Sequence, residues 1–167
     1  VMAVRSGGSV SMPGMMATVL NLGLTAEATA GLAAETGDQA FAGDSRRRFL
    51  ASWAAATADG GPVPDDAMGQ LRRAVAAVFR SWDTPRATTY RELQGIPHDL
   101  GTAVTVQAMV FGNRDDHSGT GVAFSRNPNT GAQVPFGEVL FGRQGDDVVS
   151  GVSLTRPLHD LADREPA

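Results

Sequence analysis

Residues 4–16 read Val4-Arg5-Ser6-Gly7-Gly8-Ser9-Val10-Ser11-Met12-Pro13-Gly14-Met15-Met16. The short apolar segment that leads into this stretch, Val1 to Val4, predicts a strand, and the serines and glycines after Arg5 predict a loop. Such a loop can bring backbone N–H groups close to a phosphate, because glycine has no Cβ, and an arginine at the strand end can bind phosphate oxygens. The same composition is typical of a plain surface turn, so both interpretations stay open. No Gly-Lys-Ser/Thr follows, which excludes a Walker loop, and the spacing does not fit a dinucleotide fingerprint.

Helical signals follow this loop. Thr25 to Glu35 predicts a short helix ended by Gly37, and residues 41–56 predict a second helix. The Gly/Pro-rich run at 58–66 predicts a linker, after which Asp65 and Asp66 are placed to cap a third helix. That helix has apolar residues at helical spacing on one face, namely Met68, Leu71, Val75, Val78, Phe79 and Trp82. Arg86 to Leu93 predicts a fourth helix, ended by Gly95 and Pro97.

The last third of the chain predicts strands. Residues 103–111 alternate, and we expect them to form a hairpin with residues 121–125. Residues 134–141 and 147–154 predict two more strands. A strand, then helices, then a mainly antiparallel sheet indicates the α+β class.

We expect one structural domain, with a first part at 1–57, a linker at 58–66, a second part at 67–158 and a polar tail at 159–167. The chain opens inside the first predicted strand, without the features of a signal peptide, which suggests a piece of something longer in the cytoplasm.

The composition excludes several classes of protein. The chain has 167 residues, a formal net charge of −4 and no cysteine, and all 14 of its basic residues are arginine. A mildly acidic chain does not predict a nucleic-acid partner, and no apolar run is long enough to cross a membrane. Without cysteine or lysine, disulfides, thiolate zinc sites and Schiff-base chemistry are excluded.

Carboxylates in the strand-rich part are candidate metal ligands. Glu138, Asp146 and Asp147, together with Arg126 and Asn127, lie on or beside the predicted strands. Oxygen ligands of this kind can hold a Mg²⁺ ion that also binds phosphates. The alternative is a solvated turn at Asp146-Asp147 and an outward-facing Glu138.

Other polar and aromatic residues predict structural roles. His98, His117 and His159 lie in predicted turns or the tail without metal-ligand spacing. Arg46 to Arg48 indicate a solvated helix face, with phosphate binding as the lesser interpretation. Trp53 and Trp82 occupy helix-periodic apolar positions and are expected in the core.

Several strings together resemble a known family. They are Val4 to Gly7, Ser11 to Met16, Thr18 to Leu24, Ala77 to Trp82 with Pro85 to Ala87, Val106 to Asn113, Gly121 to Pro128, Gly137-Glu138, Gln144-Gly145 and Asp147 to Val149. In this order they strongly resemble the nucleotide-binding domain of the pyruvate, phosphate dikinase family.

The resemblance implies a partial ATP-grasp-like domain that binds Mg-ATP. In the family a phosphoryl group passes to a histidine on a swivelling domain, and a barrel domain then makes phosphoenolpyruvate from pyruvate. By resemblance, Arg5 is a phosphate-binding arginine, Glu138 serves nucleotide or Mg²⁺, Gln144 and Asp146 are its neighbours, and Arg126 belongs to the Arg-Asn-Pro turn. ATP and Mg²⁺ are the implied cofactors.

The chain also departs from the family pattern. Ser9 and Ser153 stand where arginines are expected, unless Arg156 replaces the second, and Ala17 stands where an acid is expected. A long insert between Trp53 and Met68 is reduced to the linker, and the lysine-bearing lid, the swivelling domain and the barrel are missing. Each lost charge-assisted contact costs a few kcal/mol by order of magnitude. Two hypotheses therefore stay open: part of a dikinase, or a non-catalytic remnant that binds nucleotide weakly or only packs against a partner. Apolar surface left uncovered predicts self-association.

Overall fold

The computed structural model describes residues 1–57, 60–149, 151 and 153–164. The chain divides into two compact units, residues 1–109 and residues 110–167. The α+β class that the sequence predicts is confirmed, and the strands form two small antiparallel sheets, one in each unit.

The first unit is built around its opening strand. β1 (Met2–Gly7) lies between β2 (Thr18–Leu22) and β3 (Ala103–Ala108), and both pairings are antiparallel. The register with β3 runs without a break from Met2 opposite Ala108 to Gly7 opposite Ala103. The register with β2 shifts between Met2 and Val4, and Asn21, on the β2 side of that irregularity, has a positive φ of 57°.

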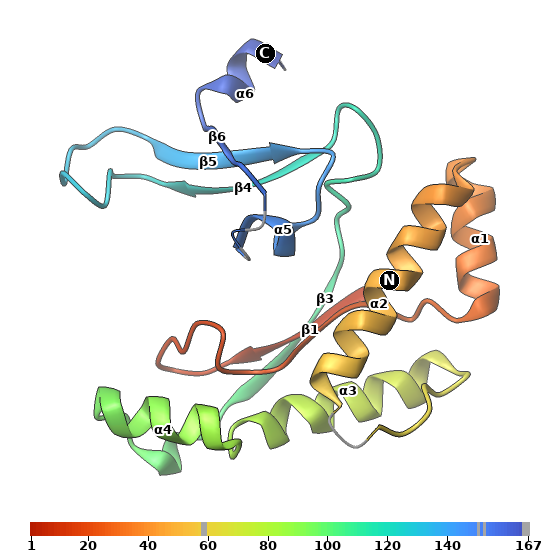
Figure 1. Cartoon of the computed structure of the whole chain (residues 1–167), viewed down its shortest axis with the longest axis horizontal. Coiled ribbons are helices and arrows are strands. Elements are labelled where there is room, and N and C mark those ends of the chain that lie inside the picture. The colour runs from red at the N-terminus through yellow and green to blue at the C-terminus, as the bar shows by residue number, and fades with distance from the viewer. Residues whose placement is uncertain (58–59, 150, 152, 165–167) are drawn as a thin grey trace. The chain divides into compact units, whose positions relative to one another are not determined.

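Four α-helices surround this sheet. They are α1 (Ala26–Thr36), α2 (Gln39–Ala56), α3 (Ala67–Ser81) and α4 (Pro85–Gln94), followed by a single 3₁₀ turn, η1 (His98–Leu100). Each α-helix starts at a side-chain cap that satisfies a free backbone N–H, supplied by Thr25, Asp38, Asp66 and Thr84 in turn. Glycines in the left-handed conformation, Gly37 and Gly95, end α1 and α4. All four predicted helices are confirmed, and Figure 1 shows α1 and α2 as an antiparallel pair.

The core of the first unit lies where α2 and α3 pack on β1 and β2. Its buried members are Val4, Val19, Leu22, Leu24, Phe49, Trp53, Ala74 and Val78. On α3 the small residues Ala74 and Ala77 are buried, while Met68 and Phe79 are 55% and 48% exposed. Small side chains let the helix approach the sheet closely, which turns part of the predicted apolar face outward.

The second unit is a thin sheet flanked by two short helices. β4 (Gly119–Phe124), β5 (Phe136–Phe141) and β6 (Arg156–Pro157) are antiparallel in that order, with α5 (Gly145–Val149) and α6 (Asp160–Arg164). Figure 1 shows α5 and α6 on opposite sides of the β4–β5 ribbon. The strands approach very closely at Gly137, where a Cβ would lie 2.1 Å from the carbonyl oxygen of Val122, so only glycine fits.

Two sequence predictions are wrong. Residues 103–111 do not form a hairpin with 121–125: β3 pairs with β1, and β4 pairs with β5. Alternation identifies a strand but not its partner. Residues 147–154 do not form a strand, because Gly145–Val149 is helical, Ser153 and Leu154 are irregular, and residues 150 and 152 lie outside the described part. The predicted tail contains α6, and Arg164 stacks on the Phe141 ring at 4.3 Å.

The predicted domain boundaries stay predictions. Residues 60–66, the described part of the predicted linker, contain no helix or strand. This segment is nevertheless held to α3, because Arg73 Nη1 donates to the carbonyl of Pro62 at 2.5 Å and Gln70 Nε2 donates to that of Pro64 at 2.9 Å.

Phe49→Ala tests the core of the first unit. Phe49 is fully buried and meets Trp53 edge-on at 5.7 Å, so its loss should lower the free energy of unfolding by about 3–5 kcal/mol. Urea unfolding followed by tryptophan fluorescence measures this, since both tryptophans lie in the first unit. The control is Leu50→Ala on the exposed side of α2, expected to change stability by no more than about 0.5 kcal/mol. Equal losses in the two variants would contradict the assignment.

We also expect the isolated chain to self-associate. Val122 and Phe124 on β4 are exposed, as are Met68 and Phe79 on α3, and uncovered apolar surface drives association. Sedimentation should give a mass above 17.4 kDa. Comparing Val122→Thr/Phe124→Thr with Met68→Gln/Phe79→Gln identifies the responsible face, and a clean monomer with a cooperative thermal transition would refute the expectation.

Candidate functional site

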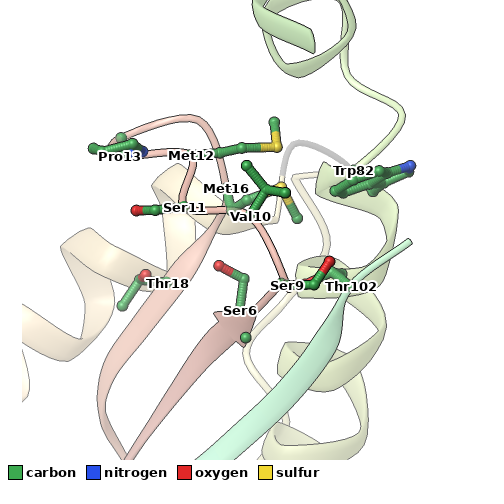
Figure 2. A pocket seen from close by; sticks show the side chains of 13 residues that line it. Ser6, Ser9, Val10, Ser11, Met12, Pro13, Met16, Thr18, Trp82 and Thr102 are labelled. Atoms are coloured by element: carbon green, nitrogen blue, oxygen red, sulfur yellow. The ribbon is translucent and has the colours of Figure 1, made fainter. Parts of the chain in front are cut away.

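A pocket of about 490 Å³ lies beneath the Gly/Ser/Met loop of the first unit. Figure 2 shows Ser11 and Pro13 of the loop on one side of this pocket and Trp82 on the other. Its lining residues are Ser6, Gly7, Gly8, Ser9, Val10, Ser11, Met12, Pro13, Gly14, Met16, Thr18, Trp82 and Thr102. The loop that the sequence left open as phosphate-binding or as a plain turn therefore lines a concave surface.

The loop is fixed at its middle and where it rejoins β2. Met12 is buried in a small cluster with Trp82 and Ala87, and Met15 and Met16 pack against that cluster. Where the loop rejoins β2, the backbone N–H of Ala17 donates to Ser81 Oγ on α3 at 3.0 Å. Gly14 has a positive φ of 71°, a conformation that favours glycine.

The chemistry of the pocket suits an anion bound by neutral donors. Its polar side chains are all hydroxyls, from Ser6, Ser9, Ser11, Thr18 and Thr102. Among the described residues that line it, none carries a charge. Hydroxyls and loop N–H groups can bind phosphate oxygens, but without a cation they bind them less strongly.

Arg5 lies beside this pocket without lining it. It is exposed on β1, directly opposite Thr18 of β2 and Thr105 of β3. Directly opposed residues of an antiparallel pair point to the same face of the sheet, so Arg5 lies one strand away from the pocket residue Thr18.

Glu138 lies on β5 in the second unit. Its side chain is exposed, and Oε2 accepts a hydrogen bond from Thr155 Oγ1 at 2.8 Å. It shares a face with the opposed pairs Thr120–Leu140 and Phe124–Phe136. A Cβ at Gly145 would contact Thr120, which places α5 over this same face.

Gln144 and Asp146 lie at the start of α5. Gln144 is buried, and its backbone N–H donates to Asp147 Oδ2 at 3.0 Å. One carboxylate oxygen of Asp146, Oδ1, is shielded from solvent. The second unit thus carries Glu138, Gln144 and Asp146 on one side of its sheet. Within the described part of the chain, no three acidic or histidine side chains are close enough together to form a metal cage of their own.

Other polar residues of the second unit serve local turns. Arg126 is exposed and donates through Nη1 to the carbonyl of Gly131 at 2.6 Å, while Asn127 Oδ1 accepts from the backbone N–H of Asn129 at 2.9 Å. In the turn before β4, the hydrogen bond from the Ser118 hydroxyl holds the pKa of the Asp115 carboxyl below its usual value. Arg156 pairs with Asp160 at 3.2 Å.

The remaining candidates have structural roles. Arg47 and Arg48 both pair with Asp44, and Arg46 donates to the carbonyl of Leu24. His159 is paired with Asp160. Trp53 and Trp82 are buried, as predicted.

Sequence reasoning missed three contributors to the pocket. Trp82 was expected only in the core, but it also forms a wall of the pocket. Thr102 comes from the segment just before β3 and reaches the loop because β3 pairs with β1. Met12 anchors the loop by packing its side chain against Trp82 and Ala87. The Gly-Thr pair before a predicted strand was a weak signal for Thr102, and nothing in the sequence placed it beside Ser9.

Comparison with known proteins decides the family. The model of the family described as "Pyruvate phosphate dikinase, AMP/ATP-binding domain" matches residues 1–157. The chain belongs to this family. The pyruvate, phosphate dikinase of Clostridium symbiosum is 42% identical over 212 residues, which cover 99% of this chain and 24% of that protein. The chloroplastic pyruvate, phosphate dikinase 1 of Oryza sativa subsp. japonica is 42% identical over 211 residues, covering 99% of this chain and 22% of that protein. The Rhizobium meliloti enzyme is 41% identical over 207 residues, covering 97% and 23%.

Two facts about this dikinase-family chain follow from the comparison. It spans about a quarter of the length of these relatives. The alignment with the Clostridium protein runs over 212 positions, more than the 167 residues of this chain, so positions of the relative have no counterpart here.

None of the helices in the described ranges has the length and apolar character needed to cross a bilayer.

Proposed function

We propose that this chain is the ATP- and Mg²⁺-binding portion of a pyruvate, phosphate dikinase. The overall reaction would convert ATP, pyruvate and phosphate to phosphoenolpyruvate, AMP and diphosphate. The phosphoryl group would pass through a histidine on a swivelling domain that is not among these 167 residues. The observation that carries the proposal is the hydroxyl-lined pocket under the loop at residues 8–16, in a family whose domain is described as binding AMP or ATP.

The first unit would bind the phosphates. The hydroxyls and N–H groups of the loop would face the phosphate oxygens, and Arg5, one strand from Thr18, would add a positive charge at the edge of the pocket. Phosphoryl transfer asks the protein mainly to position groups and to neutralise charge, so a rigid loop with one arginine fits this role.

The second unit, taken by itself, carries acidic and amide candidates. Glu138 and Gln144 are the candidates for the nucleotide, and Glu138 and Asp146 are the candidates for Mg²⁺. Arg126 is a further nucleotide candidate, although its guanidinium already supports its own turn.

The donor set fits Mg²⁺ that is shared with a substrate. Glu138 and Asp146 offer carboxylate oxygens, and Asp146 has one oxygen shielded from water. Mg²⁺ is commonly held by one or two carboxylates together with substrate phosphates, so the absence of a larger acidic cluster among the described residues is compatible with it. When bound, the ion would neutralise phosphate charge.

A second candidate function has its own support. Among its described lining residues the pocket lacks charge, and Ser9, where the family pattern has an arginine, is one of them. A non-catalytic remnant that binds nucleotide weakly, or that only packs against a partner, would look like this. The swivelling histidine domain and the pyruvate-binding barrel are the partners that the dikinase proposal requires, in cis or in trans.

Calorimetric titration of Mg-ATP into the chain tests the proposal. Arg5→Ala and Glu138→Ala should each weaken binding at least tenfold, about 1.4 kcal/mol. Arg72→Ala and Glu92→Ala, at exposed positions on α3 and α4, are the matched controls and should leave the affinity unchanged. No heat at millimolar nucleotide would exclude an autonomous ATP site, and unchanged affinity in both test variants would remove the residue assignment.

Ser9→Arg separates a pocket that binds phosphate from a remnant that only packs against a partner. Ser9 is exposed and lines the pocket, so an arginine there adds a charge without being buried. If the pocket binds phosphate, the dissociation constant for Mg-ATP should fall about tenfold, in line with a charge-assisted hydrogen bond. Ala54→Arg, on the exposed side of α2, makes the same change of net charge elsewhere. Equal effects of the two variants would favour the remnant.

A further inference from the structure

Arg91 is a buried cation that none of the proposed functions uses. It lies on α4 and is 2% exposed. Its guanidinium donates to the carbonyl of Trp82 at 2.6 Å, to Nδ1 of His98 at 3.0 Å and to the hydroxyl of Thr88 at 3.4 Å. None of these three partners is a carboxylate. Removing a guanidinium from water is costly unless its donors are satisfied, so this arrangement requires each partner to be well placed.

Arg91 and its partner His98 both contact Trp82. Besides bonding the Trp82 carbonyl, Arg91 places its Cζ 4.1 Å from the centroid of the indole ring, a cation–π contact. The indole Nε1 in turn donates to the carbonyl of His98 at 3.0 Å. Trp82 is therefore held at its ring face, its ring nitrogen and its backbone by Arg91 and His98 together, which leaves the ring a single position.

Trp82 transmits this position to the pocket. Its ring packs in one cluster with Met12 and Ala87, and it forms the wall of the pocket opposite the loop. Figure 2 shows Met12 and Met16 reaching from the loop toward the indole. A change in the tilt of the indole would move Met12, and with it the loop whose serines and N–H groups line the pocket.

We propose that Arg91 is a positioning residue for ligand binding in this pocket. It fixes the indole of Trp82 and through Met12 sets the loop at residues 8–16 in the shape that accepts an anionic ligand. His98 supports this arrangement, because its Nδ1 accepts from Arg91 and its backbone carbonyl accepts from the indole. The ligand part of this inference rests on the proposed nucleotide function, whereas the positioning of Trp82 does not.

A single-tryptophan protein makes the inference measurable. The chain has two tryptophans, and in the described part of the chain Trp53 Nε1 has no hydrogen-bond partner. Trp53→Phe therefore removes no hydrogen bond and leaves Trp82 as the only tryptophan of the chain. In this background, the acrylamide quenching and the emission maximum of Trp82 report the pocket wall, and calorimetry with Mg-ATP reports binding.

The expected results distinguish positioning from mere stability. Arg91→Met replaces the guanidinium with an apolar chain of similar length; it should red-shift Trp82 emission, raise its quenching and weaken Mg-ATP binding about tenfold. Arg91→Lys keeps the positive charge but loses the planar guanidinium with its fixed set of N–H donors, so it should behave like Arg91→Met. His98→Ala, at an exposed position that folding should tolerate, should act in the same direction, while His98→Asn, whose amide oxygen can replace Nδ1, should restore the parent values.

Each outcome supports or overturns the positioning role of Arg91. A lower thermal midpoint with unchanged quenching and affinity, in both Arg91→Met and His98→Ala, would overturn the proposal and leave Arg91 a structural residue. If Arg91→Met does not fold, the contrast between His98→Ala and His98→Asn carries the test. If the parent shows no Mg-ATP binding, the proposed function fails, and the quenching of Trp82 still decides whether Arg91 positions it.

Discussion

The pairing of β1 with strands on both of its sides is the constraint on which the first unit depends. β1 is the central strand of its sheet, and its Val4 is fully buried against α2 and α3. Its partner β3 lies about a hundred residues later in the chain. Because this pairing closes the unit, residues 1–7 and 102–108 lie side by side, and the helices between them must fold back over the sheet. The long loop closure is entropically costly, and the buried core of α2 and α3 offsets it.

The same pairing builds the pocket. Thr102 meets the Gly/Ser loop only because β3 runs antiparallel to β1, and Trp82 reaches it only because α3 packs on β1. The pocket therefore joins three segments that are distant in sequence. Trp82 forms one wall of the pocket, and it packs against Met12 and is held by Arg91 and His98. The other lining residues contribute mainly hydroxyls and loop backbone.

The second unit has a different physical character. It buries few side chains, among them Val139, Leu140 and Gln144, and leaves Val122 and Phe124 exposed. Its sheet is held by close backbone approach at Gly137 and by turns whose polar side chains, such as Asn127 and Asp115, bond within the turn. Glu138 lies on β5 of this small unit, and Gln144 and Asp146 lie at the start of α5.

Local sequence signals determined much of this protein. Caps, glycines and apolar residues at helical spacing predicted all four α-helices of the first unit, and many strings in one order resembled the family that the comparison shows. Sequence could not decide strand partners, since alternation is the same whichever strand lies alongside, and so the 103–111 hairpin was wrong. It could not show that residues 145–149 are helical, because short polar-apolar runs fit either period. Only the tertiary structure decided that Trp82 and Thr102 complete the pocket, that Arg5 lies beside it, and that Arg91 is buried, because each of these depends on which surfaces meet when the chain closes on β1.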